Sequence, residues 1–191
     1  MKKIIAVKTV WTIGAVFVAA MTIGAVLDFK NGININSVCS CIKMLLYLAA
    51  FTTGLIYLFK AGKDKFALTS ACIYAVAAVF GFLTGVLDGS SYAPLDMLSM
   101  VVNVLVFILF PLTVAAFFKG RESKAFPLCE KFWWVPSAVS IAVALVESIN
   151  TEINDSHGFD VSLIVLDLVV ALILLLPMFS MTLTVKNQKK I

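Results

Sequence analysis

Six long apolar stretches divide this chain of 191 residues, and short polar segments separate them. A helix needs about 20 mostly apolar residues to cross the hydrocarbon layer of a bilayer, because each residue advances the helix by about 1.5 Å. The pattern therefore predicts an all-α, polytopic integral membrane protein with six transmembrane helices. We expect one domain over 1–191, with spans at about 4–27, 38–59, 66–87, 97–118, 132–149 and 161–185.

The polar segments between the predicted helices alternate in the sign of their charge. Short basic loops stay on the cytoplasmic side of a membrane, so the alternation predicts that both termini are cytoplasmic. The two ends and the second and fourth connectors hold the basic residues Lys2, Lys3, Lys60, Lys63, Lys65, Lys119, Arg121, Lys124, Lys131, Lys186, Lys189 and Lys190. The other connectors hold Lys30 and the acidic residues Asp28, Asp88, Asp96, Glu152, Asp155 and Asp160.

The composition supports a membrane protein and restricts the kinds of partner that we expect. Apolar residues make up 61% of the chain and charged residues only 14%, whereas soluble domains hold about 25% charged residues. The longest connector, 119–131, leaves no room for a soluble domain, so any ATPase would have to be a separate chain. The net charge of +4 is explained by cytoplasmic helix ends next to anionic lipid, and we expect no nucleic-acid partner. Short loops without appended domains favour the cytoplasmic (inner) membrane of a bacterium.

Small residues and prolines mark places where helices pack or bend. Ala77, Gly81 and Gly85 recur every four residues, which predicts a face for close helix packing, inside the chain or against a partner. Three prolines fall in the cytoplasmic halves of the last three spans, where each is expected to kink its helix because it removes a backbone donor. They are Pro111, Pro136 and Pro177.

Polar side chains within the spans form one narrow stripe on each of several helices. A charged side chain at the centre of a membrane helix costs at least about 2.5–3.5 kcal/mol, so these stripes are expected to face inward. The fifth helix, for example, carries Ser137, Ser140, Ala144 and Glu147 on one side. Lys8 lies in the inner leaflet, and no acidic residue of a span lies at its depth.

Four polar residues from four helices fall in the outer leaflet once the chain is threaded in the predicted direction. They are Lys43, Asn103, Glu147 and Asp167. One interpretation is a structural ion pair of Lys43 with Asp167 or Glu147. The other is an outward-facing site whose acids bind a cation, a proton or an amine-bearing solute.

Enzyme chemistry has little support in the sequence. The single histidine, His157, lies in an acidic loop and has no second histidine with which to hold a metal, so we predict neither a metal site nor a cofactor. The four cysteines lack the spacing of a thiol oxidoreductase. We expect no enzyme, and an intramembrane enzyme ranks third among the functions considered.

Two other functions remain. The first is binding or transport of a small solute or ion through the outer-leaflet polar site. The alternative is a structural or accessory subunit of a larger membrane complex, packed against other membrane subunits through Ala77, Gly81 and Gly85. In size and topology alone the chain is similar to the substrate-binding subunits of vitamin importers and to several small transporter classes. The first of these would imply a separate ATPase as partner. No motif carries that similarity, and it assigns no residue a role.

Overall fold

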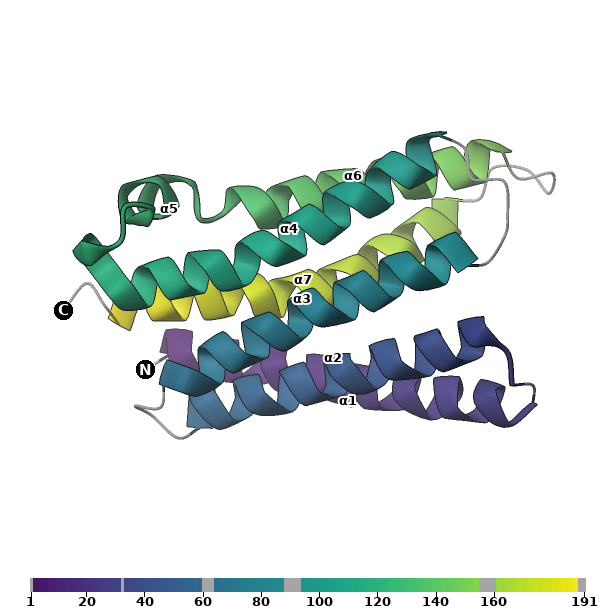
Figure 1. Cartoon of the computed structure of the whole chain (residues 1–191), viewed down its shortest axis with the longest axis horizontal. Helices are drawn as coiled ribbons and strands as arrows, with labels where there is room; N and C mark the ends of the chain where they lie inside the picture. The colour runs from purple at the N-terminus through teal and green to yellow at the C-terminus, as the bar shows by residue number, and fades with distance from the viewer. Residues whose placement is uncertain (1, 32, 60–63, 88–93, 155–160, 189–191) are drawn as a thin grey trace.

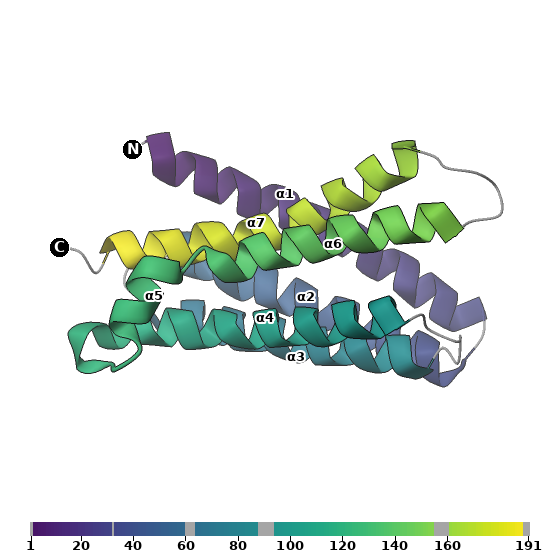
Figure 2. The same ribbon diagram turned by 90° about the horizontal axis from the view of Figure 1, so that it is seen from above.

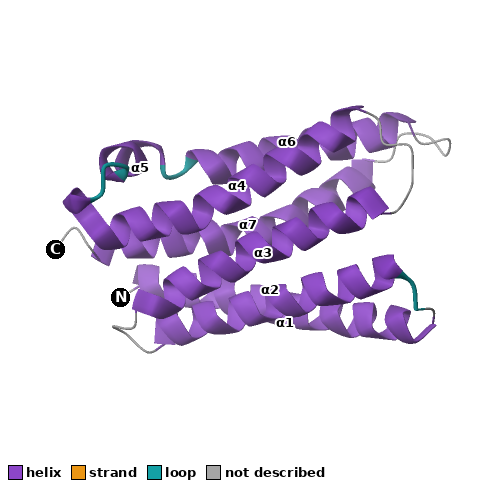
Figure 3. Cartoon of the chain, viewed as in Figure 1, coloured by secondary structure: helices purple, strands orange, loops and turns teal. Residues whose placement is uncertain are grey.

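The structure, a computed structural model, describes residues 2–31, 33–59, 64–87, 94–154 and 161–188, which contain helices and turns but no strand (Figure 3). Side chains at a few positions within these ranges, Glu147 and Asp167 among them, lie outside the description. The helices are α1 (Lys2–Asn31), α2 (Ile35–Phe59), α3 (Asp64–Leu87), α4 (Pro94–Lys119), η1 (Gly120–Glu122), α5 (Phe126–Phe132), α6 (Val135–Asn154) and α7 (Val161–Gln188).

The six long helices form a closed ring. Each of α1, α2, α3, α4, α6 and α7 contacts the next, and α7 returns to α1. Both termini lie at the same end of the bundle (Figures 1 and 2). We call this the terminal end. The opposite end, where α1 ends and α2 begins, is the far end.

The lengths and composition of the helices confirm an all-α polytopic membrane protein. Within the described residues, α1, α2, α3, α4 and α7 each include a continuous segment long and apolar enough to cross a bilayer. A sixth span results when α5 and α6 are counted together, although the chain bends by 47° between them. Several charged residues of the predicted connectors lie outside the described residues: Lys60, Lys63, Asp88, Asp155, Asp160, Lys189 and Lys190.

The structure corrects the fifth span. The sequence predicts one helix over 132–149 after a plain connector, but the connector forms η1 and α5, and α6 begins only at Val135. Pro136 therefore lies in the first turn of α6, where no intrahelical donor is needed. The bend predicted for this span lies just before it, at the 47° break between α5 and α6. Pro111 and Pro177 do lie inside α4 and α7. Figure 2 shows α7 changing direction along its length.

An aromatic cluster packs inside the ring of helices, near the middle of α2, α3 and α4. The ring of Tyr74 has its centroid 5.5 Å from that of Tyr47, 5.6 Å from Phe51 and 5.9 Å from Phe110. Its ring also stacks on Phe107 at 6.1 Å. These rings come from α2, α3 and α4, so the cluster joins three consecutive helices by dispersion contacts.

Trp11 packs α1 against α2 and α7 on the terminal side of this cluster. It is fully buried, its ring lies 5.3 Å from that of Phe51, and its indole N–H donates a hydrogen bond to Ser180 Oγ at 3.1 Å. Gly54 leaves the space that the indole occupies, because a side chain there would overlap Trp11. Small residues of this kind allow the close packing on which helix association in lipid depends.

Contacts at the terminal end hold the short helix α5 against α7. Lys186 Nζ donates a hydrogen bond to the Glu130 carbonyl at 2.8 Å and lies 5.2 Å above the Trp133 ring. Trp133 in turn lies 4.7 Å from the ring of Phe179. These contacts fix the bend between α5 and α6.

Candidate functional site

A cavity of about 400 Å³ lies inside the ring, and all six long helices contribute to its lining. Its lining residues on α1, α2 and α3 belong to the half nearer the far end, and those on α4 and α7 extend from that half to the middle of the helix. Those on α6 belong to the half nearer the terminal end. The volume falls in the range of about 300–1,000 Å³ that small-molecule sites occupy. Most of the wall is apolar, with aromatic side chains such as Phe17, Phe82 and Phe107.

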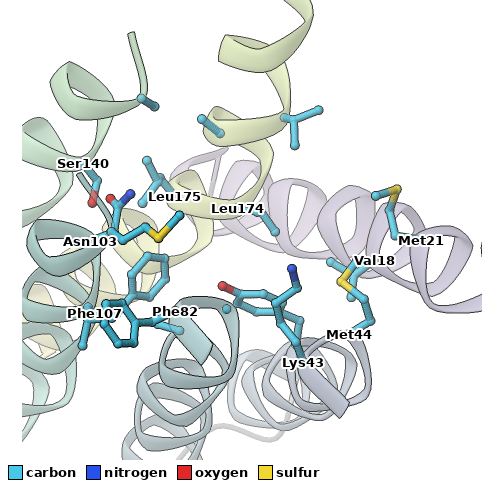
Figure 4. Close-up of a pocket in the computed structure, with 18 of the residues that line it drawn as sticks. Val18, Met21, Lys43, Met44, Phe82, Asn103, Phe107, Ser140, Leu174 and Leu175 are labelled. Carbon is cyan, nitrogen blue, oxygen red and sulfur yellow. The ribbon is translucent and has the colours of Figure 1, made fainter. Parts of the chain in front are cut away.

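Lys43 enters the cavity from α2. Its side-chain nitrogen points inward in Figure 4, and its aliphatic stem passes close to Gly81 of α3. A Cβ atom at position 81 would lie 3.4 Å from Lys43 Cδ, so the glycine leaves room for the stem. The sequence-predicted lysine thus lies where a molecule in the cavity would meet it.

Asn103 lines the same cavity from α4. Within the described part of the chain, no residue forms a hydrogen bond with its side-chain amide. Leu105, two residues further along α4, is 56% exposed on the outside of the ring. One face of α4 therefore meets the cavity and the other meets lipid.

Ser140 of α6 belongs to the polar stripe predicted to face inward, but it was not among the four predicted site residues. Its side chain is 2% exposed, and its hydroxyl has no hydrogen-bond partner among the described residues. Other buried hydroxyls do have one: Thr22 donates to the Val18 carbonyl at 2.7 Å, and Ser70 to the Ala50 carbonyl at 2.7 Å. An unpaired buried hydroxyl costs about 1–3 kcal/mol. A bound molecule with a suitable group would offset that cost.

Glu147 and Asp167 stay predictions as site residues, because their side chains lie outside the described part of the structure. Their backbone positions can be placed. Position 147 follows the lining residue Ala144 by three residues on α6, and position 167 precedes the lining residue Val170 by three on α7. Each is therefore less than one helical turn from the cavity wall along its helix.

The small-residue stripe of α3 packs against helices of the same chain. Ala77 is fully buried, and Gly81 lies beside Lys43 of α2. A Cβ at Gly85 would lie 2.7 Å from the terminal carbon of Met100 on α4. These residues bring α3 close to α2 and α4 and help to shape the cavity.

Lys8 has a contact that the sequence did not predict. Its nitrogen lies 4.6 Å from the centre of the Phe59 ring, and the negative face of an aromatic ring attracts a cation in this position. At this depth the cation is therefore met by an aromatic ring of α2.

The described residues contain no group of three or more histidine, cysteine or acidic side chains that could hold a metal; His157 lies outside them. The cavity instead combines an amine, an amide and hydroxyls with a largely apolar wall, which is the composition of a binding site for a small molecule. Comparison with protein-family models, curated proteins and solved structures gives no match to this chain.

Proposed function

We propose that the protein binds a small solute in the central cavity and serves as a membrane transporter or as its solute-binding subunit. The observation that carries this proposal is the meeting of Lys43, Asn103 and Ser140, from three helices, at one cavity inside the ring. Polar side chains are expensive inside a membrane, and a ligand site explains why three of them converge.

The charge pattern supports an orientation for this site. By the positive-inside rule, the basic residues favour a cytoplasmic location for the terminal end. The far end then faces outward, and we expect a solute to reach the cavity from that side. The aromatic cluster around Tyr74, together with Trp11, lies between the cavity and the cytoplasm. Transport would require these side chains to move, and the helix segments beyond Pro111 and Pro177 are the parts of α4 and α7 that would move with them.

The alternative, an accessory subunit joined to a partner through Ala77, Gly81 and Gly85, is not favoured by any specific observation. These residues face neighbouring helices of the same chain. A partner would have to use another surface. An enzyme is likewise not favoured by any specific observation.

The experiment is the reaction of introduced cysteines with a membrane-impermeant thiol reagent. The four natural cysteines, all free, are first replaced by serine. Asn103→Cys should then react with the reagent, because it faces a cavity that water enters. Leu105→Cys, its matched control on the same helix, should react about tenfold more slowly, because a thiol in lipid stays protonated and unreactive. Equal, slow reaction at both positions would overturn the proposal.

A further inference from the structure

One side of the cavity is polar but carries no charge. Asn103 and Ser140 lie on this side in Figure 4, whereas Lys43 enters from the other side. We call Asn103 and Ser140 the neutral corner. Both helices that supply it, α4 and α6, contact each other. Neither side chain has a hydrogen bond to another described residue, so both keep hydrogen-bonding capacity that a ligand could use.

The chemistry of the neutral corner restricts the group that it can bind. An amide and a hydroxyl can each donate and accept a hydrogen bond. A charged group placed against them would lose its hydration without gaining an opposite charge, which is unfavourable in an apolar enclosure. The corner therefore favours an uncharged group that both donates and accepts, such as a carboxamide, an alcohol or the edge of a heterocycle.

The walls next to the neutral corner are apolar. Phe82 and Phe107 supply aromatic rings, and Leu174 and Leu175 supply aliphatic side chains from α7. Aromatic rings pack well against a flat apolar body in offset or edge-on arrangements. The ligand that fits this arrangement has a ring-sized apolar body beside its polar group.

We propose, building on the proposed function, that the solute is a small organic molecule with a ring-sized apolar body and an uncharged donor–acceptor group. Its donor–acceptor group hydrogen bonds with Ser140 and Asn103. Its body packs against Phe82 and Phe107. Ser140 is kept without an internal partner because the ligand supplies one.

Three probes with the same phenyl body test this proposal: benzamide, benzoate and benzylammonium. Val104 lines the cavity, so a bound probe should slow the labelling of Val104→Cys in the cysteine-free protein. Benzamide should halve the labelling rate at a lower concentration than either charged probe. Ser140→Ala should raise that concentration about fivefold, because one hydrogen bond is lost. Ser148→Ala is the matched control: Ser148 is also buried on α6, but its hydroxyl donates to the Ala144 carbonyl at 2.9 Å, so this variant should not raise it.

Three results would overturn the proposal: stronger protection by a charged probe, no effect of Ser140→Ala, or normal labelling that no probe slows. Each would leave the proposed function standing, since labelling of Val104→Cys would still show an accessible cavity. If neither Val104→Cys nor Asn103→Cys reacted at all, that result would contradict the proposed function and this proposal together.

Discussion

Lys43 of α2 and Gly81 of α3 meet at the wall of the cavity, where a Cβ on residue 81 would lie 3.4 Å from Lys43 Cδ. The glycine has two consequences. It lets the lysine stem lie along α3, and it keeps open the space into which the ammonium points. A larger side chain at position 81 should therefore change the cavity more than it changes the fold.

Gly81→Leu is the first prediction. Its side chain should fill part of the cavity and displace Lys43, so labelling of Val104→Cys should fall about tenfold because the thiol loses contact with water. The helix content should be unchanged by circular dichroism. Gly24→Leu is the matched control, since a Cβ there meets no atom within 4 Å. Unchanged labelling in Gly81→Leu would contradict the role given to this glycine.

Gly54→Ala tests the packing around Trp11. The added methyl would overlap the indole ring, and forced overpacking of a core typically costs about 1–3 kcal/mol. The purified protein should therefore aggregate at a lower temperature in detergent, as followed by size-exclusion chromatography after heating. Gly24→Ala should behave like the parent protein. Equal stability of the two variants would show that Trp11 does not pack as described.

Ser140→Ala and Ser70→Ala should differ in their effects on thermal stability. The first removes a buried hydroxyl that has no described partner, so the thermal stability of the ligand-free protein should stay equal or rise. The second removes the 2.7 Å hydrogen bond to the Ala50 carbonyl and leaves that acceptor with one partner fewer, at a cost of about 1 kcal/mol. Thermal melts of both variants under the same conditions give the comparison. A fall for Ser140→Ala as large as that for Ser70→Ala would mean that its hydroxyl has an internal partner.

The ion pair predicted from the sequence can be tested with a double-mutant cycle. If Lys43 pairs with Asp167, Lys43→Met and Asp167→Asn should each destabilise the protein, by up to about 3–5 kcal/mol for a buried pair. The double variant should then be more stable than the sum of the single effects predicts. Lys8→Met combined with Asp167→Asn is the control and should be additive, because Lys8 contacts the Phe59 ring. Additivity in both cycles would exclude this pair and leave Glu147 as the sequence-predicted partner to test.

The hydrophobic pattern was enough to predict the helices, because spanning a bilayer requires long apolar segments. It could not show the turn between α5 and α6: apolar residues continue across Trp133 and Trp134, so composition does not mark the break. Lys43 and Asn103 were predictable because polar residues are rare in such segments. Ser140 was predicted only to lie on an inward-facing stripe and not to belong to the site, because buried serines usually bond to their own helix backbone. Only the three-dimensional arrangement shows that this one does not.

The sidedness of labelling at position 103 tests the central claim most directly. The protein with Asn103→Cys as its single cysteine is prepared in two kinds of vesicle. In sealed vesicles its outer face is exposed, and in inverted vesicles its cytoplasmic face is exposed. A membrane-impermeant thiol reagent should react rapidly in the first preparation. It should react about tenfold more slowly in the second, because the buried aromatic cluster blocks water from the cytoplasmic side. Faster reaction from the cytoplasmic face, or a rate no higher than that of Leu105→Cys from either face, would contradict an outward-facing solute site.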